Sequence, residues 1–134
     1  MKTYVLDASA LLIFLQKKAS APKVGELFKE ALRGRTEILM SAVNCGEVYG
    51  VILRVHGPGR ATAAMSAIYP LPLQLIDVTS QKALRAADIK FRYKLYYVNS
   101  FAASLAVDHK ATLVTSDSDF RSLGNTVSIL WLKQ

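Results

Sequence analysis

The sequence contains a single cysteine, Cys45, so no disulfide bond can form within the chain. Its two histidines, His56 and His109, show no metal-ligand spacing with each other or with Cys45. No apolar run is long enough to span a bilayer, and the N-terminus does not have the pattern of a signal peptide. These absences indicate a protein of a reducing cytoplasm without a membrane anchor.

Acidic residues are also scarce, with 10 Asp and Glu against 17 Lys and Arg, which gives a formal net charge of +7. An excess of this kind suits a polyanionic partner such as RNA or DNA. Hydrophobic residues make up 51% of the chain, which excludes a disordered protein. A length of 134 residues suffices for one compact domain, so we predict a single domain over residues 1–134.

Short apolar runs alternate with helical patterns along the chain. The runs that predict strands are residues 3–7, 37–40, 73–78, 111–115 and 126–130. Apolar spacing and capping residues predict helices over residues 10–16, 23–33, 41–56, 60–68, 100–109 and a long one from 79. This alternation predicts an α/β fold, a three-layer α/β/α sandwich with a mainly parallel sheet.

Carboxylates follow the predicted strands at the point where each one ends. Asp7 ends the first strand, Glu47 lies in the second turn of the helix after the second strand, and Asp117 and Asp119 follow residues 111–115. The carboxyl ends of parallel strands meet at one edge of a sheet. Clustered carboxylates destabilise a fold unless a cation lies among them, and oxygen ligands suit Mg²⁺ or Mn²⁺. In a basic chain this pattern predicts a nuclease in which metal-activated water attacks a phosphodiester.

Each of these acids also has a purely structural interpretation. Asp7 and Asp117 are good N-caps for the helices that follow them, and Asp119 suits the first turn of a helix. Glu47 is alternatively a solvated helix residue paired with Arg54 or Arg35. The joint arrangement of the acids, rather than any one of them, favours chemistry.

Two polar residues are candidates for supporting that site. Asn44, one turn before Glu47, either holds the Glu47 carboxylate in place or faces solvent. Thr115 either orients a ligand or is only a strand residue. We interpret Asp77 and Asp88 as surface or capping acids. The long basic helix from residue 79 is either a solvated face or a contact surface for RNA.

Three segments of the sequence resemble the PIN-domain family and, within it, the VapC-type toxins of prokaryotic type II toxin-antitoxin systems, which implies a prokaryotic cytoplasm. They are VLDASALL at 5–12, SAVNCGEV at 41–48 and ATLVTSDSDF at 111–120, and the resemblance covers nearly the whole chain. It implies an endoribonuclease dependent on Mg²⁺ or Mn²⁺, with Asp7, Glu47 and Asp117 binding the metal and Asp119 as an auxiliary acid. It also implies a homodimer and a small antitoxin whose C-terminal segment blocks the site.

The chain departs from the family pattern at Asn99, where the family places an Asp that is catalytic and binds metal. An amide keeps one neutral oxygen but loses the negative charge, so we expect weaker metal binding at this position. The chain is then a natural variant that works without this acid, a natural binding-only member, or a nuclease disarmed by substitution. Asn99 is also a preferred N-cap residue, which is compatible with all three.

Two other functions remain open beside the toxin. One is a catalytically inactive PIN module that binds RNA or a partner protein through the same groove, and Asn99 is its main support. The other is a housekeeping RNA-processing nuclease that has no antitoxin.

Overall fold

A computed structural model describes all residues from 1 to 134 and contains one five-stranded sheet with the order β3-β2-β1-β4-β5. The strands are β1 (Lys2–Leu6), β2 (Thr36–Ser41), β3 (Gln74–Ile76), β4 (Thr112–Thr115) and β5 (Ile129–Trp131). All four pairings between neighbouring strands are parallel. The predicted α/β fold with a parallel sheet is therefore confirmed, with the final strand three residues later than expected at its start.

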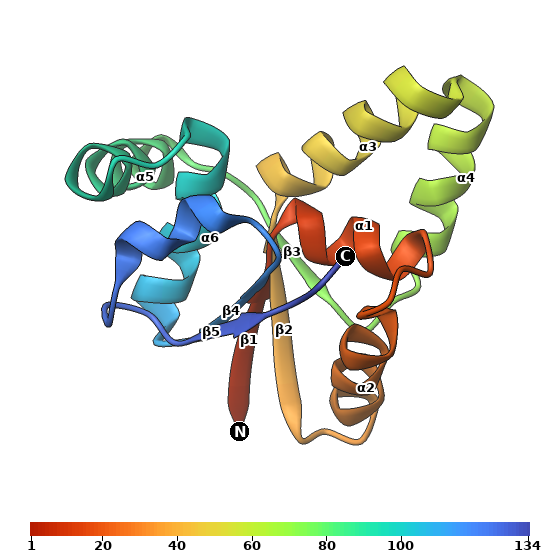
Figure 1. The fold of residues 1–134 in the computed structure, drawn as a ribbon, viewed down its shortest axis with the longest axis horizontal. Helices are drawn as coiled ribbons and strands as arrows, with labels where there is room; N and C mark the ends of the chain where they lie inside the picture. The colour runs from red at the N-terminus through yellow and green to blue at the C-terminus, as the bar shows by residue number, and fades with distance from the viewer.

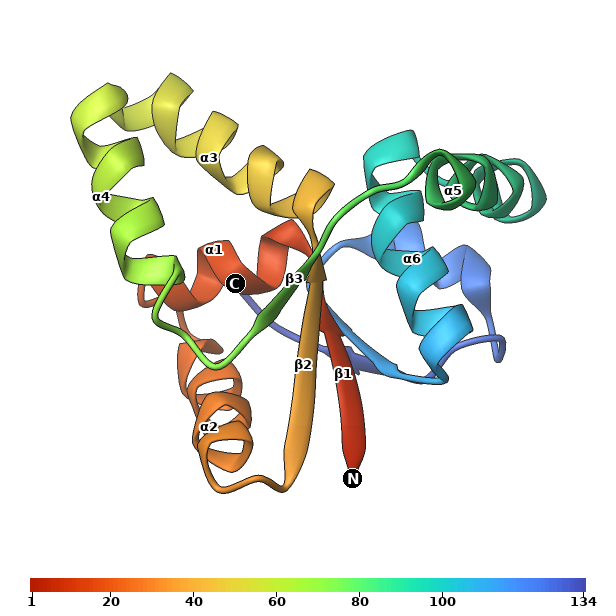
Figure 2. The same cartoon turned by 180° about the vertical axis from the view of Figure 1, so that it is seen from behind.

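Helices cover both faces of this sheet (Figures 1 and 2). One face carries α1 (Ala8–Leu15), α2 (Ala21–Leu32), α3 (Ala42–His56) and α4 (Pro58–Ile68). The other face carries α5 (Ser80–Tyr93), α6 (Tyr97–His109) and the short 3₁₀ helix η1 (Ser118–Leu123). None of these helices combines the length and hydrophobicity that crossing a membrane requires.

The central strand β1 serves both layers of the core. Val5 packs into the cluster on the α6 side, Leu6 packs into the cluster on the α1 side, and neither is exposed. A strand buried on both faces has to be apolar at successive positions, which explains the uninterrupted run before Asp7. The first polar side chain after this run lies where the strand leaves the sheet.

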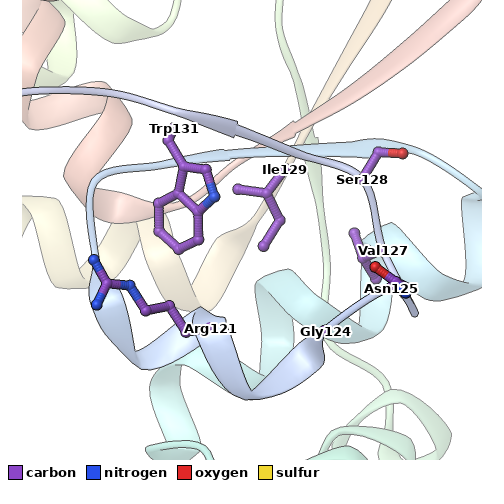
Figure 3. A pocket seen from close by; sticks show the side chains of 7 residues that line it. All are labelled: Arg121, Gly124, Asn125, Val127, Ser128, Ile129 and Trp131. Carbon is purple, nitrogen blue, oxygen red and sulfur yellow. The ribbon is translucent and has the colours of Figure 1, made fainter.

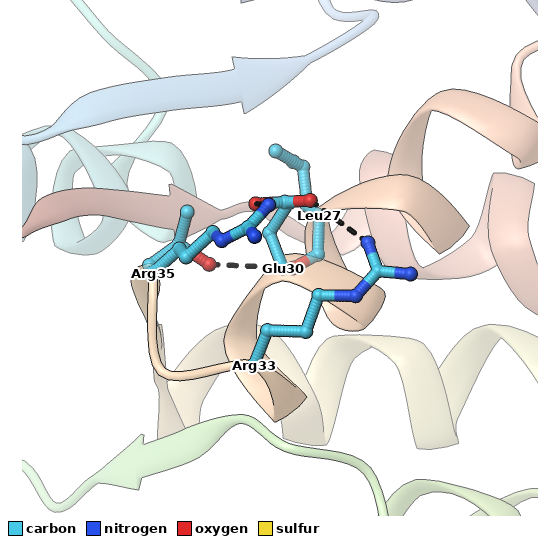
Figure 4. A network of polar contacts seen from close by, with 5 residues as sticks. Leu27, Glu30, Arg33 and Arg35 are labelled. Carbon is cyan, nitrogen blue, oxygen red and sulfur yellow. Dashed lines mark hydrogen bonds and ion pairs between the residues drawn. The ribbon is translucent and has the colours of Figure 1, made fainter.

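The connection from α2 to β2 is held by polar contacts at the amino edge of the sheet (Figure 4). Glu30 accepts hydrogen bonds from Arg33 at 3.1 Å and Arg35 at 3.4 Å, and Thr36 Oγ1 donates to the Leu27 carbonyl at 3.3 Å. Gly34 ends the helix with φ +73°, where a side chain would be strained. The possible pairing of Arg35 with Glu47 is therefore wrong, because Arg35 reaches Glu30 in the adjacent helix instead.

Helix α6 begins three residues earlier than the sequence pattern indicates. Its N-cap is Tyr96, so Asn99 lies in the first turn of the helix rather than at the cap. The interpretation of Asn99 as an N-cap is therefore wrong. The shift leaves the Asn99 side chain free to bond with residues of another segment.

Removal of a central core side chain tests this account of the two-sided sheet. We expect Leu6→Ala to lower the free energy of unfolding by about 3 kcal/mol, because the cavity lies in the strand that both layers share. Leu84→Ala removes the same atoms from a side chain that is 69% exposed on α5, and it should change stability by less than about 0.5 kcal/mol. Urea unfolding of both variants measures the difference, and equal losses would contradict the assigned core.

Candidate active site

Four of the predicted site residues come together at the carboxyl edge of the sheet. Asp7 leaves β1, Asp117 follows β4, Asn99 lies in the first turn of α6 and Glu47 lies in the second turn of α3. Figure 1 shows the amino ends of α1, α3 and α6 gathered at this edge. The parallel arrangement explains the gathering, because every strand ends and every following helix begins on the same side.

Asp7 is the buried centre of the site, with only 2% of its surface exposed. Its Oδ1 accepts hydrogen bonds from the Ala10 amide at 2.9 Å and the Ser9 hydroxyl at 2.7 Å. Its Oδ2 accepts from Thr115 Oγ1 at 2.5 Å, across 108 residues of sequence. Asp7 is thus the N-cap of α1 and also the link between β1 and β4.

Burial dominates the electrostatics of this carboxyl. Desolvation raises the pKa of Asp7 from 3.8 to about 6, the negative charge of Asp117 adds to the rise, and the hydrogen bonds from Thr115, Ser9 and Ala10 oppose it. A carboxylate that is hydrogen-bonded this well and still has a raised pKa lies in a site poor in water and rich in negative charge. Asp7 and Asp117 therefore act on one another, as two carboxylates that share a site do.

Ser9, which was not among the predicted site residues, connects the two strand ends. Besides its bond to Asp7, the Ser9 hydroxyl lies 3.2 Å from Thr115 Oγ1 and accepts from the Ser116 amide at 3.0 Å. A hydroxyl two residues after a helix-capping acid was the available signal, although it also fits an ordinary first helical turn. Thr115 is more than a strand residue, since it donates to Asp7 and accepts from the Asp117 amide at 2.9 Å; a role in orienting a ligand stays a prediction.

Asn99 joins the two acids of the segment after β4. Its Nδ2 donates to Asp117 Oδ2 at 3.2 Å and to Asp119 Oδ2 at 2.8 Å. Asp117 also caps η1, because its Oδ1 accepts from the Asp119 amide at 2.9 Å. The structural interpretation of Asp117 is thus correct, and it coexists with a place in the cluster. The amide protons of Asn99 place partial positive charge between two carboxylates.

Asp119 has a second partner that ties the site to the α5–α6 connection. Its Oδ2 accepts a hydrogen bond from the backbone amide of Tyr96 at 3.0 Å. Tyr96 offers no side chain oxygen that caps α6, so Asp119 satisfies an amide that would otherwise lack a partner at this helix end. The position of the acid and the start of α6 therefore depend on one another.

Glu47 approaches the cluster from the opposite layer. Its pKa is raised by burial and further by the charge of Asp117, while the Asn44 amide opposes the rise. Asn44 is fully buried, but it donates to the Val98 carbonyl at 3.0 Å and so fastens α3 to α6. Glu47 Oε1 is buried and has no hydrogen-bond partner. A buried carboxylate oxygen without a partner costs free energy unless a proton or a cation satisfies it.

The donor chemistry of the site suits a hard divalent cation, but no preformed cage is present. No three side chains of His, Cys, Asp or Glu lie close enough together to hold an ion jointly. The unsatisfied oxygen of Glu47 and the charge of Asp117, which raises the pKa of both Asp7 and Glu47, fit a cation with oxygen ligands. The amide of Asn99, which bonds to Asp117 and Asp119, is the departure from that fit. The remaining acids considered, Asp77 and Asp88, are exposed, as expected for surface residues.

A cavity of about 420 Å³ lies beside this edge, between η1 and β5 (Figure 3). Arg121 lines it from η1, and Ile129 and Trp131 line it from β5. Trp131 pairs in register with Thr115, the residue whose hydroxyl donates to Asp7, so the Trp131 backbone lies on the strand next to it. The cavity has a cationic and an aromatic wall, but it contains none of the acids.

Comparison with known proteins agrees with this geometry. The family model of the PIN domain matches residues 4–125. No curated protein sequence matches the chain.

Several solved structures share the fold of the chain at low sequence identity. The structure of VapBC2 from Rickettsia felis bound to a promoter DNA fragment is 14% identical, with a TM-score of 0.75, and the match covers 98% of this chain and 99% of that one. VapC20 of Mycobacterium tuberculosis, described as a toxin that cleaves the sarcin-ricin loop, is 16% identical with a TM-score of 0.70, covering 90% and 95%. DNA-bound VapBC from Salmonella typhimurium is 15% identical with a TM-score of 0.71, covering 97% and 98%.

The raised pKa of Asp7 predicts a specific pH dependence of stability. The unfolded chain releases this proton near 3.8 and the native protein near 6, so the native state binds it more tightly. The contribution to the free energy of unfolding is fully present below 3.8 and is lost as the pH rises through about 6. The loss amounts to about 3 kcal/mol.

Asp7→Asn removes this titration. Its stability relative to the parent should therefore increase by up to about 3 kcal/mol as the pH rises through that interval. Urea unfolding in EDTA measures the effect free of bound ions. Asp77→Asn, at an exposed acid, is the matched control, and its free energy of unfolding should change with pH in the same way as that of the parent. A constant difference between Asp7→Asn and the parent would contradict the burial assigned to Asp7.

Proposed function

Because the chain belongs to the PIN domain family, we propose that it is a metal-dependent endoribonuclease whose cleavage of RNA is weakened by Asn99. The observation that carries the proposal is that Asp117 acts electrostatically on two carboxylates from other elements, within a hydrogen-bonded cluster at one edge of the sheet. Asp117 raises the pKa of both Asp7 and Glu47. A basic protein that places its few acids together at the carboxyl edge of a parallel sheet has a binding site there.

Asp7, Glu47 and Asp117 are the residues that would hold Mg²⁺ or Mn²⁺, with Asn99 and Asp119 at the side of the site next to α6. Because the three carboxylates do not form a ready cage, their side chains would have to move closer together around the ion. When bound, such an ion activates water and stabilises the leaving oxygen of a phosphodiester. Mg²⁺ and Mn²⁺ accept the same oxygen ligands, so the proposal covers both. The excess of Lys and Arg in the chain suits binding of the RNA backbone.

The residues of the chain divide this work among them. Thr115 and Ser9 orient the Asp7 carboxylate through hydrogen bonds to its two oxygens. The Asp119 amide and Asn99 fix the two oxygens of Asp117. Glu47 Oε1, which is buried and has no partner, is the oxygen that a bound cation would satisfy. Two carboxylates are thus held in place by hydrogen bonds, and one oxygen of the third has no partner.

Asn99 weakens the site through the charge that it lacks and the donors that it brings. An Asp at this position would add a negative charge beside Asp117 and Asp119, and the cluster would then need a cation. The Asn99 amide instead donates to both acids, so it partly replaces the cation. We expect lower metal affinity and slower cleavage than in a variant with Asp at position 99.

A second candidate function is a binding-only PIN module, and the same two hydrogen bonds favour it. With Asp117 and Asp119 both satisfied by Asn99, this side of the site is stable without an ion. Such a module would bind RNA or a partner protein in EDTA and would cleave nothing at any metal concentration.

We further propose that the protein acts as a single-domain, cytoplasmic toxin of the VapC type, as a homodimer with a small antitoxin partner. Support comes from the fold shared with VapBC complexes from Rickettsia felis and Salmonella typhimurium. Expression of Asn99→Asp in a bacterial host should arrest growth, and a co-expressed small neighbouring gene should relieve the arrest. Growth arrest that no such gene relieves favours the housekeeping nuclease instead.

Cleavage of a mixed RNA pool with Mg²⁺ or Mn²⁺ tests the catalytic proposal. Asn99→Asp should cleave at least about tenfold faster than the parent, because one charge-assisted ligand contributes more than about 1.4 kcal/mol. The double variant Asn99→Asp with Asp7→Ala, purified identically, controls for contaminating nuclease and should be inactive. If neither the parent nor Asn99→Asp cleaves RNA, the proposal of an enzyme is wrong and the binding-only module is favoured.

Thermal unfolding gives a test that needs no activity. In EDTA, Asn99→Asp should be less stable than the parent by about 2 kcal/mol, because two donors are lost and a negative charge is added. Adding Mn²⁺ should restore this stability by linkage and shift the parent much less. The opposite ranking, with the parent stabilised more, would contradict the role given to Asn99.

A further inference from the structure

The connection from α5 to α6 carries an unusual group of exposed aromatic side chains. Phe91 is 88% exposed, Tyr96 is 75% exposed and Tyr97 is 45% exposed. Together with Lys90, Lys94 and Leu95 they line a cavity of about 620 Å³, and Asp119 of the acid cluster also lines it. We refer to Phe91, Tyr96, Tyr97, Lys90 and Lys94 as the aromatic platform.

From this arrangement we propose that the aromatic platform binds single-stranded RNA, stacking unpaired bases on its rings and holding phosphates with Lys90 and Lys94. The inference rests on the proposed function and names the part of the surface that takes substrate next to the acids. The chemistry is that of sequence-tolerant single-strand binding, which combines aromatic faces with a basic track.

The platform is fixed to the acid cluster rather than placed at random on the surface. The Tyr96 amide donates to Asp119 Oδ2 at 3.0 Å, and Asp119 accepts from Asn99 at 2.8 Å. The next ring, Tyr97, packs edge-on against buried Phe101 with a centroid distance of 5.0 Å. A strand of RNA stacked here would therefore lead directly into the carboxylates, over rings whose backbone is already ordered.

Charge distinguishes this surface from an ordinary apolar contact. Lys90 and Lys94 are both exposed in the last turn of α5 and at its end, and Asp119 is the only acid that lines the cavity. A polyanion is favoured there, whereas two copies of the same surface would bring four lysines together. Self-association through this face thus requires burial of like charges, which RNA binding avoids.

The backbone of Lys94 allows a substitution that removes the charge without harming the fold. Lys94 is the C-cap of α5 with φ +57°, a left-handed conformation that glycine adopts more easily than lysine. Lys110 is the C-cap of α6 with φ +51°, at the opposite end of that helix from Asn99. Lys94→Gly and Lys110→Gly therefore make the same chemical and backbone change, one at the platform and one far from it.

Binding is measured by fluorescence anisotropy with a labelled single-stranded RNA of about 12 nucleotides in Mg²⁺, with the RNA checked for integrity afterwards. Phe91→Ala should weaken binding about tenfold, and Tyr69→Ala, which removes an aromatic ring that is 70% exposed at the end of α4, should not. Lys94→Gly should lower the slope of log affinity against log salt by about 0.7, and Lys110→Gly should leave it unchanged. A fully paired duplex should be insensitive to Phe91→Ala, because its bases cannot stack on a ring.

Two outcomes would overturn the inference. Equal effects of Lys94→Gly and Lys110→Gly, with no effect of Phe91→Ala, would mean that RNA does not contact the platform. Light scattering gives the second outcome. If the parent is a dimer and Phe91→Ala is a monomer with unchanged RNA affinity, the platform is a contact between two copies of the chain. Failure of the proposed nuclease function can be distinguished from failure of this inference. If Asn99→Asp cleaves no RNA but RNA binding still depends on Phe91 and Lys94, the nuclease proposal fails and the RNA-binding role of the platform is retained.

Discussion

The buried carboxylate of Asp7 is the constraint on which the rest of the site depends. It caps α1, accepts the Thr115 hydroxyl from the neighbouring strand and acts electrostatically on Asp117. A group buried this deeply retains its charge only where several donors oppose the desolvation cost. Its raised pKa shows that the donors do so incompletely. The site is therefore held in a costly state that a proton or a cation relieves.

On the other side of the cluster, Asn99 reduces the repulsion between carboxylates in a different way. Its amide protons neutralise part of the charge on Asp117 and Asp119 without any ion. The cost of clustered acids is thereby reduced within the chain itself, at the expense of the charge that would attract a metal. Stability and metal affinity are thus opposed at this position, as is common where an active site stores strain.

The fold and most of the acid cluster were predictable because both follow from periodicity. Buried strands ending at Asp7 and before Asp117, with helices between, leave few arrangements other than a parallel sheet with its acids at one edge. The start of α6 was not predictable, because the Tyr96 amide is satisfied by Asp119, 23 residues further along the chain. Ser9 was missed for the same reason. Its partners, Thr115 and Ser116, approach it only in the folded sheet. Local patterns identify elements, whereas contacts between distant segments decide caps and orienting hydroxyls.

The separation of 108 residues between Asp7 and Thr115 has a consequence for synthesis of the protein. The first strand leaves the ribosome early, but its neighbour β4 and the hydroxyl that orients Asp7 come from the last sixth of the chain. A nascent or truncated chain that stops before β4 therefore contains no assembled site, whatever else of it has folded. Translation itself thus delays the assembly of this site until the polypeptide is almost complete.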